Sequence, residues 1–400
     1  MMNITIIGAG YVGLITGVGF AKLNNNVSIV DLNHNLINQL KNNNPPFYEP
    51  DLDSYLKNET VSNNIKFYTD YESGISKNTE VVFVCVQTPT NLDSGNTETK
   101  FVESALETLK KLENNFNICI KSTIKSELIE LLCDKYNIDF NKIIFNPEFL
   151  REGSAFYDFF NPDRIVIGGL DKNIVDNFSK IYDSFDCKIV ITDPKSSQLI
   201  KYLSNTYLAM RLSFVNETYK LVHENGGDPL GVIEAMGLDK RIGNHYFRPS
   251  PGWGGSCFPK DVKEVVFSYQ ENYELPLMSN IIKSNDLQID WFVEYLHRIS
   301  VEQNLTNIVL IGAPFKENTD DLRESPTLKI YNKLKPLNGN ISIYDSRINL
   351  GSEYTSITTI EELKKNCLYV EMFPDESVDR EVLISKIKSL ENTFIFKMWI

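Results

Sequence analysis

One cysteine, Cys257, lies where its sulfur could act as a nucleophile. It comes directly after the glycine-rich residues 252–255 and precedes an apparent helix start, with Lys260 and Asp261 three and four residues further on. Pro259 suits the first turn of a helix, and a helix N-terminus or a neighbouring cation favours the thiolate form of a cysteine. The segment indicates an activated thiol beside a loop that admits a ligand. The alternative interpretation is a buried thiol next to an ordinary turn.

A second candidate site is the pattern GxGxxG, formed by Gly8, Gly10 and Gly13 after a predicted strand and at the start of a predicted helix. Glycines here permit a tight turn and let a pyrophosphate approach the backbone. Asp31 ends the next predicted strand, where a carboxylate accepts hydrogen bonds from the adenosine ribose. No arginine lies nearby, so the pattern predicts an NAD site, not an NADP site. An ordinary glycine-rich turn is the alternative.

Polar residues also recur along one face of a predicted helix that begins at Ser197. Lys201, Asn205 and Asn216 share roughly this face at 3.6 residues per turn. Hydrogen bonding between helices is the alternative role for an isolated asparagine. Lys201 is harder to explain in that way, because a buried lysine needs a partner.

Four further polar segments come after predicted strands. They are residues 87–89, 121–123, 146–153 and, in the last third of the chain, 315–325. Ligands bind at the carboxyl ends of parallel strands, so these loops are candidates to line a site. For the last segment, a solvated charged loop is the alternative.

The elements that must position these residues alternate between strand and helix patterns. The alternation covers residues 1–193, stops in a mainly helical stretch over 194–300, and resumes over 301–400. We therefore predict an α/β protein with an N-terminal Rossmann domain, a central helical domain and a smaller Rossmann-like C-terminal domain. The helix from Ser197 runs without proline to Gly226 and would span on the order of 45 Å. Such a length suits a spine between domains or a dimer contact.

Bulk composition excludes several classes of function. The chain has 400 residues and a net charge of -13, which argues against a nucleic-acid binder. No apolar run approaches the ~20 residues of a membrane span, and residues 3–10 do not resemble a signal peptide. Six cysteines without CxxC spacing and four scattered histidines predict neither disulfides nor a metal site. A cytoplasmic protein is the simplest expectation, with Cys85 and Cys119 as inert core residues.

Taken together, these segments resemble the nucleotide-sugar dehydrogenases of the UDP-glucose/GDP-mannose dehydrogenase family. The resemblance covers about residues 3–330, with the motifs in the family's order, and the 241–261 segment is most similar to the UDP-glucose branch. It rests on residues 8–14, 47–50, 87–89, 121–123, 146–153, 163–169, 201–217, 241–261 and 315–325. It implies two successive NAD-dependent oxidations that convert the sugar 6-hydroxymethyl group of UDP-glucose to a carboxylate. It also implies a homodimer, in which Arg241 reaches the neighbouring subunit's site.

The resemblance further implies residue roles. Cys257 would capture the aldehyde, Lys201 and Asp261 would handle protons and oxyanions with Asn205 as an added donor, and Glu148 and Thr123 would serve hydrolysis. The implied NAD-binding residues are Gly8, Gly10, Tyr11, Val12, Gly13, Asp31, Thr88, Thr123, Glu152, Lys260 and Arg323. The implied substrate-binding residues are Glu148, Phe149, Leu150, Arg151, Glu152, Lys201, Asn205, Arg241, Tyr246, Phe247, Arg248, Pro249, Ser250, Gly254 and Lys316.

Some features depart from the family's pattern. Gln87 stands where a small residue is common, Trp253 where Phe or Tyr is usual, and Ala313-Pro314 alters the approach to residues 315–316. Beyond about Asp345 the likeness fades. Alternatives are the same chemistry on GDP-mannose or UDP-N-acetylmannosamine, a two-electron NAD-dependent hydroxy-acid dehydrogenase, and a non-catalytic NAD-binding protein.

Overall fold

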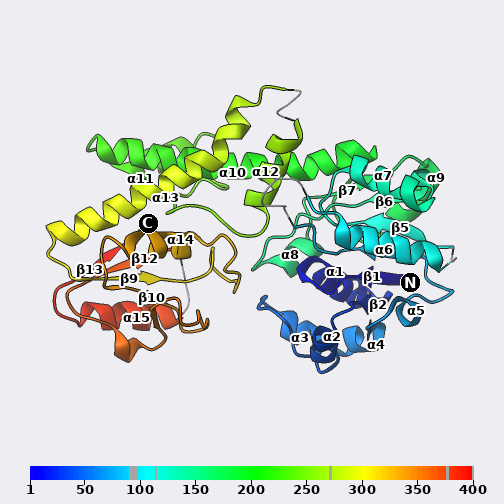
Figure 1. Cartoon of the computed structure of the whole chain (residues 1–400), viewed down its shortest axis with the longest axis horizontal. Helices are drawn as coiled ribbons and strands as arrows, with labels where there is room; N and C mark the ends of the chain where they lie inside the picture. Colours follow the sequence, from blue (N-terminus) through cyan, green and yellow to red (C-terminus); the bar gives the residue numbers. More distant parts are fainter. Residues whose placement is uncertain (90–96, 113–114, 270–272, 375–377, 399–400) are drawn as a thin grey trace. The chain divides into compact units, whose positions relative to one another are not determined.

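The computed structural model describes residues 1–89, 97–112, 115–269, 273–374 and 378–398 (Figure 1). The chain divides into two compact units, Met1–Ser204 and Asn205–Ile400. Each unit contains its own sheet of mostly parallel strands, so the α/β prediction is confirmed. The predicted division into three domains at residues 193 and 300 stays a prediction.

The described part of the first unit holds an eight-stranded sheet with the order β3-β2-β1-β4-β5-β6-β7-β8. Neighbouring strands are parallel, except that β6 and β7 meet antiparallel at Phe145 and Gly168. The strands are β1 (Asn3–Ile7), β2 (Asn26–Val30), β3 (Ile65–Tyr68), β4 (Val81–Val84), β5 (Asn117–Ile120), β6 (Ile143–Phe145), β7 (Arg164–Gly168) and β8 (Lys188–Thr192). All residues of β4 are buried, as expected when helices cover both faces of a sheet.

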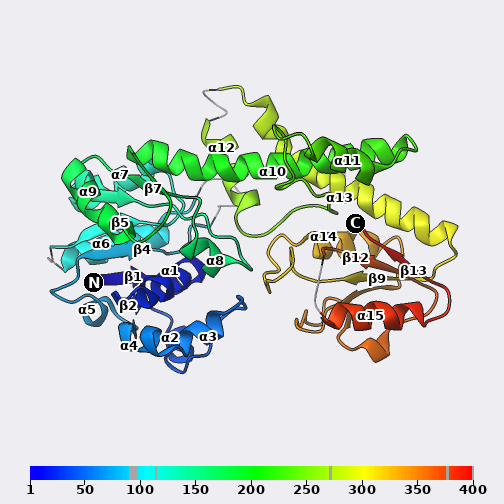
Figure 2. The same cartoon turned by 180° about the vertical axis from the view of Figure 1, so that it is seen from behind.

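Two apolar clusters cover the two faces of this sheet. Ile6 packs with Leu14 and Val18 on one face, and Val84 packs with Leu106 on the other. The helices are α1 (Tyr11–Lys22), α2 (His34–Lys41), α3 (Leu52–Leu56), α4 (Glu59–Asn64), α5 (Tyr71–Gly74), α6 (Lys100–Lys111), α7 (Ser126–Tyr136), α8 (Ala155–Phe160) and α9 (Lys172–Ser179), with short 3₁₀ turns at Phe140–Lys142 and Lys180–Tyr182. Helices α1 and α8 are neighbours in both side views (Figures 1 and 2).

The long helix expected from Ser197 is present as α10 (Pro194–Glu224). It starts three residues earlier than predicted because Pro194 is compatible with a first helical turn and Asp193 caps that turn, accepting a hydrogen bond from Ser196 N at 2.9 Å. It ends before Gly226, whose φ of +74° suits a helix terminus. The boundary between the two units falls within this helix.

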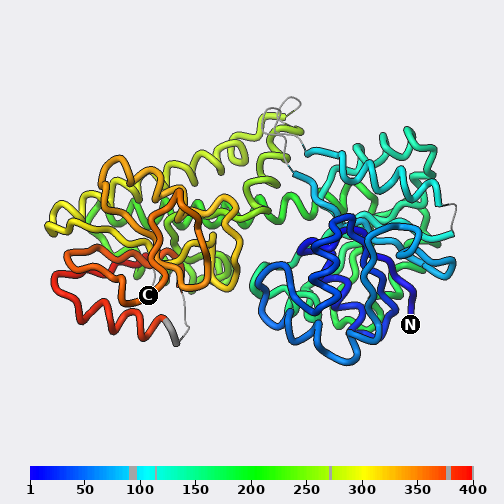
Figure 3. Tube along the Cα trace, turned by 60° about the horizontal axis from the view of Figure 1, so that its bottom comes forward, coloured from blue at the N-terminus to red at the C-terminus, as the bar shows by residue number. Residues whose placement is uncertain are grey.

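The described part of the second unit holds a five-stranded parallel sheet with the order β11-β10-β9-β12-β13. The strands are β9 (Asn307–Ile311), β10 (Ile341–Tyr344), β11 (Ser356–Ile357), β12 (Cys367–Glu371) and β13 (Thr393–Phe396), and the helices are α11 (Pro229–Gly237), α12 (Phe258–Tyr269), α13 (Pro276–Glu302), α14 (Pro326–Leu334) and α15 (Val378–Lys388). Phe292 of α13 and Tyr331 of α14 belong to one core with Leu310 of β9. Figure 3 traces this unit from α13 in yellow to α15 in red.

Two details of the second unit differ from the sequence patterns. The sequence pattern of residues 360–366 predicts a helix, but only a 3₁₀ turn, Ile360–Glu362, forms there. Thr359 and Glu362 close it as a capping box, and Leu363 is already extended. The chain end, which matched no motif, supplies the edge strand β13. None of the described helices is long and apolar enough to cross a membrane.

Candidate active site

The GxGxxG turn has the geometry of a dinucleotide site. Gly8 has a φ of +98°, and a Cβ there would lie 2.8 Å from the Cys85 carbonyl oxygen. A Cβ at Gly13 would lie 1.9 Å from the Gly8 oxygen, so packing requires both glycines. At Gly10, in contrast, no described atom lies within 4 Å of an added Cβ. The open face at Gly10, directly before α1, fits a pyrophosphate that approaches the backbone.

The Asp31 carboxylate is held beside this turn by hydrogen bonds from backbone N–H groups. Its Oδ2 accepts from Ala9 N at 2.8 Å and its Oδ1 from Asn33 N at 2.9 Å. Each carboxylate oxygen has a further acceptor position, and the side chain is only half-buried. These positions can accept ribose hydroxyls, so the residues present fit NAD.

The predicted loops meet at the carboxyl edge of the first sheet. Thr88 Oγ1 donates to the Thr123 carbonyl oxygen at 3.0 Å, which joins the loops after β4 and β5. Lys121 Nζ donates to Asn146 Oδ1 at 2.9 Å, which joins the loops after β5 and β6. Burial lowers the pKa of Lys121. Sequence patterns gave Lys121 no separate role, although its buried ammonium is central to this network.

The loop over 146–153 carries a buried ion pair. Lys201 Nζ lies 2.9 Å from Glu148 Oε1, and both side chains are less than a tenth exposed. This pair supplies the partner that a buried lysine requires. The Phe149 ring lies beside it, with the Arg164 guanidinium 3.6 Å and Lys201 Nζ 5.4 Å from the ring centroid. Arg164 was not expected near the site, because it begins a strand and no polar loop surrounds it in the sequence.

The rest of this loop is held by α8. Arg151 forms an ion pair with Asp158 at 2.5 Å, and its backbone N donates to the same carboxylate. Glu148 Oε2 accepts from Leu150 N at 2.5 Å. Glu152 is half-buried, and its charge adds a smaller contribution to the rise in the pKa of Tyr11 that burial and Glu49 cause. The predicted residues of this loop therefore lie in one connected region of the first unit.

In the second unit, Cys257 immediately precedes α12. Its carbonyl oxygen accepts from Asp261 N at 2.9 Å. The Asp261 carboxylate is 1% exposed and binds Asn205 Nδ2 at 2.6 Å and Lys260 Nζ at 2.9 Å. Asp261 thus connects Cys257 and Lys260, at the start of α12, with Asn205 of α10.

All six cysteines lie in described parts of the chain, and Cys187 and Cys257 are partly exposed while the other four are buried. Burial raises the thiol pKa of Cys85, Cys133 and Cys367 to about 12 and that of Cys119 well above its usual value. Cys85 and Cys119 are buried, as predicted. Cys257 is partly exposed, and Ser256 Oγ lies 3.5 Å from its sulfur.

The glycines before Cys257 allow a close approach of two loops. A Cβ at Gly254 would lie 2.0 Å from the Glu324 carbonyl oxygen, and one at Gly255 would lie 2.8 Å from the Phe315 ring. Gly255 N also donates to the Arg323 carbonyl oxygen at 3.0 Å. The structure therefore brings residues 315–325 against the cysteine loop.

The remaining predicted residues vary in their surroundings. Ser250 N donates to Asn216 Oδ1 at 2.8 Å, which fixes the end of the 246–250 segment on α10. Phe247 and Pro249 are buried, Tyr246 is half-buried and Arg248 is exposed. Lys316 Nζ lies over the neighbouring Phe315 ring, and the Arg323 side chain pairs with Asp321. Arg241 is 88% exposed and pairs with Asp239.

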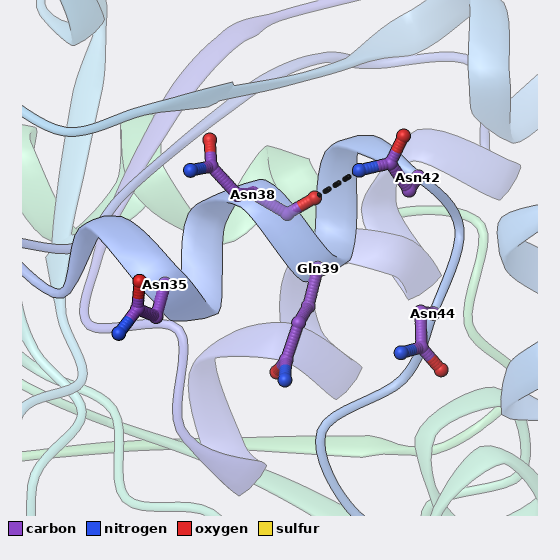
Figure 4. A pocket seen from close by; sticks show the side chains of 5 residues that line it. All are labelled: Asn35, Asn38, Gln39, Asn42 and Asn44. Carbon is purple, nitrogen blue, oxygen red and sulfur yellow. Dashed lines mark hydrogen bonds between the residues drawn. The ribbon is translucent and has the colours of Figure 1, made fainter.

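A polar pocket of about 420 Å³ lies elsewhere, along α2 (Figure 4). Five amide side chains line it: Asn35, Asn38, Gln39, Asn42 and Asn44. Asn42 Nδ2 donates to the Asn38 carbonyl oxygen at 2.7 Å. The pocket contains none of the predicted site residues and no titratable lining group. Among the described residues, no group of three or more His, Cys, Asp or Glu side chains is arranged to hold a metal ion.

Comparison with known proteins places these observations in a family. Residues 2–186 match the NAD binding domain of the UDP-glucose/GDP-mannose dehydrogenase family, 195–287 its central domain and 309–375 its UDP binding domain. A UDP-glucose 6-dehydrogenase of Bacillus subtilis is 35% identical over 86% of this chain and 79% of its own length. One from Rickettsia felis is 35% identical over 98% of this chain and 87% of its own length.

A solved structure supports the same assignment. A UDP-glucose dehydrogenase from the hyperthermophilic archaeon Pyrobaculum islandicum is 28% identical, has a TM-score of 0.86, and aligns over 100% of this chain and 94% of its own. The chain therefore belongs to the UDP-glucose/GDP-mannose dehydrogenase family and is an NAD-dependent oxidoreductase.

Proposed function

We propose that this protein oxidises UDP-glucose to UDP-glucuronate with two NAD⁺, through intermediates bound covalently to Cys257. The relatives named UDP-glucose 6-dehydrogenase support the substrate. The observation that carries the covalent route is the partly exposed Cys257 beside the network of Asp261, Asn205 and Lys260. A dehydrogenase that removes only one hydride has no use for this thiol.

The first oxidation removes a proton and a hydride from the C6 hydroxymethyl group and gives an aldehyde. NAD⁺, when bound, accepts the hydride; Gly10 and Asp31 would hold its pyrophosphate and ribose. Asp261 would take the hydroxyl proton. Lys201, kept in place by Glu148, would donate a hydrogen bond to the oxygen as negative charge develops on it.

The second oxidation needs the thiol because an aldehyde carbon cannot release hydride until a nucleophile has added to it. The Cys257 thiolate would add to the carbonyl carbon, and Lys201 and Asn205 would stabilise the resulting oxyanion. Loss of the second hydride converts this thiohemiacetal to a thioester. Water, placed by Thr123 and Glu148, then adds to the thioester and releases the carboxylate and the thiolate. The balance is one UDP-glucose, two NAD⁺ and one water to one UDP-glucuronate, two NADH and three protons.

We also propose that the active form is a homodimer in the cytoplasm. Tyr207, Phe214 and Leu221 lie at seven-residue spacing on α10 and are 55%, 53% and 66% exposed. Such a stripe on a long helix favours packing against a second copy. The exposure of Arg241 supports its expected role at a partner's site.

Stoichiometry tests this function directly. With limiting UDP-glucose and excess NAD⁺, we expect two NADH for each UDP-glucose consumed and UDP-glucuronate as the product. The variant Cys257→Ser should form no acid while NAD binding stays unchanged. A yield of one NADH, or full acid production by Cys257→Ser, would contradict the covalent route. Faster turnover of GDP-mannose or UDP-N-acetylmannosamine would overturn the proposed substrate.

A further inference from the structure

The motif Phe47-Tyr48-Glu49-Pro50 lies between α2 and α3 and has no role in the chemistry described above. Glu49 is only 4% exposed, although a buried glutamate is costly without partners. We propose that Glu49 is a positioning residue that ties the 146–153 loop to the dinucleotide-binding turn. The inference rests on the proposed function, because this loop carries Glu148.

Three donors converge on the Glu49 carboxylate. Its Oε2 accepts from Tyr11 OH at 2.6 Å and from Gly153 N at 2.7 Å, and its Oε1 accepts from Ala155 N at 2.7 Å. Every partner donates, so the site is built for an ionised carboxylate. The carboxylate thereby joins the first residue of α1 to the end of the loop and the first residue of α8.

Tyr11 is fixed from both ends of its side chain by this motif. Its ring centroid lies 5.0 Å from that of Phe47, and its hydroxyl group bonds Glu49. Burial, together with the hydrogen bond to Glu49, raises the pKa of Tyr11 well above its ordinary value. The phenol is therefore neutral and donates. Because Tyr11 lies within the GxGxxG pattern, a change at Glu49 reaches the cofactor turn through a single hydrogen bond.

Glu49 also provides a cap that α8 lacks locally. Ser154, at the N-cap position, makes no side-chain capping hydrogen bond with the described backbone of the first turn. Glu49 satisfies the Ala155 N–H instead. Gly153, with a φ of +84°, lets the chain turn so that both N–H groups face the same carboxylate.

The other end of the loop is anchored independently. Asn146 Oδ1 accepts from Lys121 Nζ at 2.9 Å and from Tyr182 OH at 2.6 Å. Glu148, with its ion pair to Lys201, lies between the two anchors. Loss of the Glu49 anchor would leave that end of the loop held by the Arg151–Asp158 contacts and let the Glu148–Lys201 pair shift. Catalysis is sensitive to such shifts, because misplacement by about 1 Å can cost on the order of 10²-fold in rate.

The variant Glu49→Gln tests this anchor with almost no change of shape. An amide nitrogen cannot accept, so either the Ala155 N–H or the Gly153 N–H loses its partner. We expect amide hydrogen exchange to accelerate by about tenfold or more at whichever of Gly153 and Ala155 loses its acceptor. We also expect kcat for UDP-glucose to fall by about tenfold or more while the unfolding midpoint stays high enough to assay at 25 °C. Glu72→Gln, an exposed glutamate of the same unit, serves as the matched control.

The variant Tyr11→Phe separates positioning from general stability. It removes one donor and keeps the carboxylate, so exchange at Gly153 and Ala155 should stay slow while NAD affinity falls. In the double variant, the two effects on NAD affinity should be less than additive, since they act through the one hydrogen bond between Tyr11 and Glu49. Unchanged exchange at both amides in Glu49→Gln would overturn the inference, as would a lowered unfolding midpoint with unaltered kcat. The exchange measurement needs no substrate, so failure of the proposed function is distinguishable from failure of this inference.

Discussion

The two parallel sheets of this protein begin with the same turn, and they use it differently. In the first sheet, Gly8 has a φ of +98° and Asp31 accepts from Ala9 N. In the second, Gly312 has a φ of +97° and Asp345 Oδ2 accepts from Ala313 N at 3.1 Å. Both aspartates also accept from the backbone N–H two residues further on, Asn33 N and Arg347 N.

The segment after the turn differs between the two sheets. In the first sheet, α1 starts at Tyr11, three residues after Gly8. The backbone N–H groups of its first turn can therefore bind a pyrophosphate. In the second, Pro314 leads into the 315–325 loop, and α14 starts only at Pro326. That loop packs against the glycines beside Cys257. The aspartate therefore stabilises the turn in both sheets. The NAD site is distinguished by the helix that starts directly after the turn and by the uncrowded backbone at Gly10.

The largest effect that we expect is a difference in reactivity between the cysteine thiols. Cys85 comes directly after β4, and Cys367 begins β12, the corresponding strand of the second sheet; burial raises both thiol pKa values to about 12. At pH 7 such thiols are thiolate to only about 10⁻⁵. Iodoacetamide should therefore modify Cys257 in the native protein at least about 10³-fold faster than either of these two buried thiols. Peptide mass spectrometry would show this, and comparable labelling of Cys85 or Cys367 would contradict it.

The glycine positions of the first turn should separate folding from binding. Gly13→Ala forces a Cβ against the Gly8 carbonyl oxygen, so we expect a loss of roughly 2–4 kcal/mol in unfolding free energy. Gly10→Ala meets no described atom and should fold normally but bind NAD at least about tenfold more weakly. Denaturant unfolding and NAD titration measure the two effects. Gly339→Ala, also without a described neighbour, is the control for the substitution itself.

Substitutions of Asp31 and Asp345 test whether stabilising the turn and binding the ribose are separable roles of the aspartate. Asp31→Asn and Asp345→Asn each put an amide nitrogen opposite a backbone donor, and each should cost about 1–3 kcal/mol of stability. Only Asp31→Asn should also weaken NAD binding. If Asp345→Asn weakened NAD binding equally, the second turn could not be assigned a purely structural aspartate.

A small dependence of folding stability on pH is expected from the 315–325 loop, which follows the turn of the second sheet. The hydrogen bond from Lys329, at 2.7 Å, lowers the pKa of Glu324. The folded-state pKa is depressed, so this contribution to stability is present above the ordinary glutamate pKa and is lost as the pH falls through the folded value. The size is about 1 kcal/mol or less for such a partly exposed pair. Unfolding of Glu324→Gln should differ from wild type at pH 7 and converge with it at pH 3.

Much of the fold was predictable because buried parallel strands and the GxGxxG context give strong local signals. Asp31, Lys201 and Cys257 could be singled out from residue type and spacing alone. Arg164 and Lys121 could not, because their importance comes from contacts with Phe149 and Asn146 that are distant in sequence. The prediction of a helix over residues 360–366 was wrong. Hydrophobic periodicity over so short a segment does not outweigh a capping box that is followed by an extended residue.

Helix α10 carries Lys201 and Asn205 one turn apart, and this has an evolutionary consequence. Each residue of an α-helix advances the side-chain direction by about 100°. Inserting or deleting one amino acid between these two positions would swing the amine and the amide onto different faces, whatever residue was added. Under the proposed mechanism, descendants of this gene can therefore vary the composition of that stretch and the size of surface loops, but they must keep the count of residues from 201 to 205 fixed.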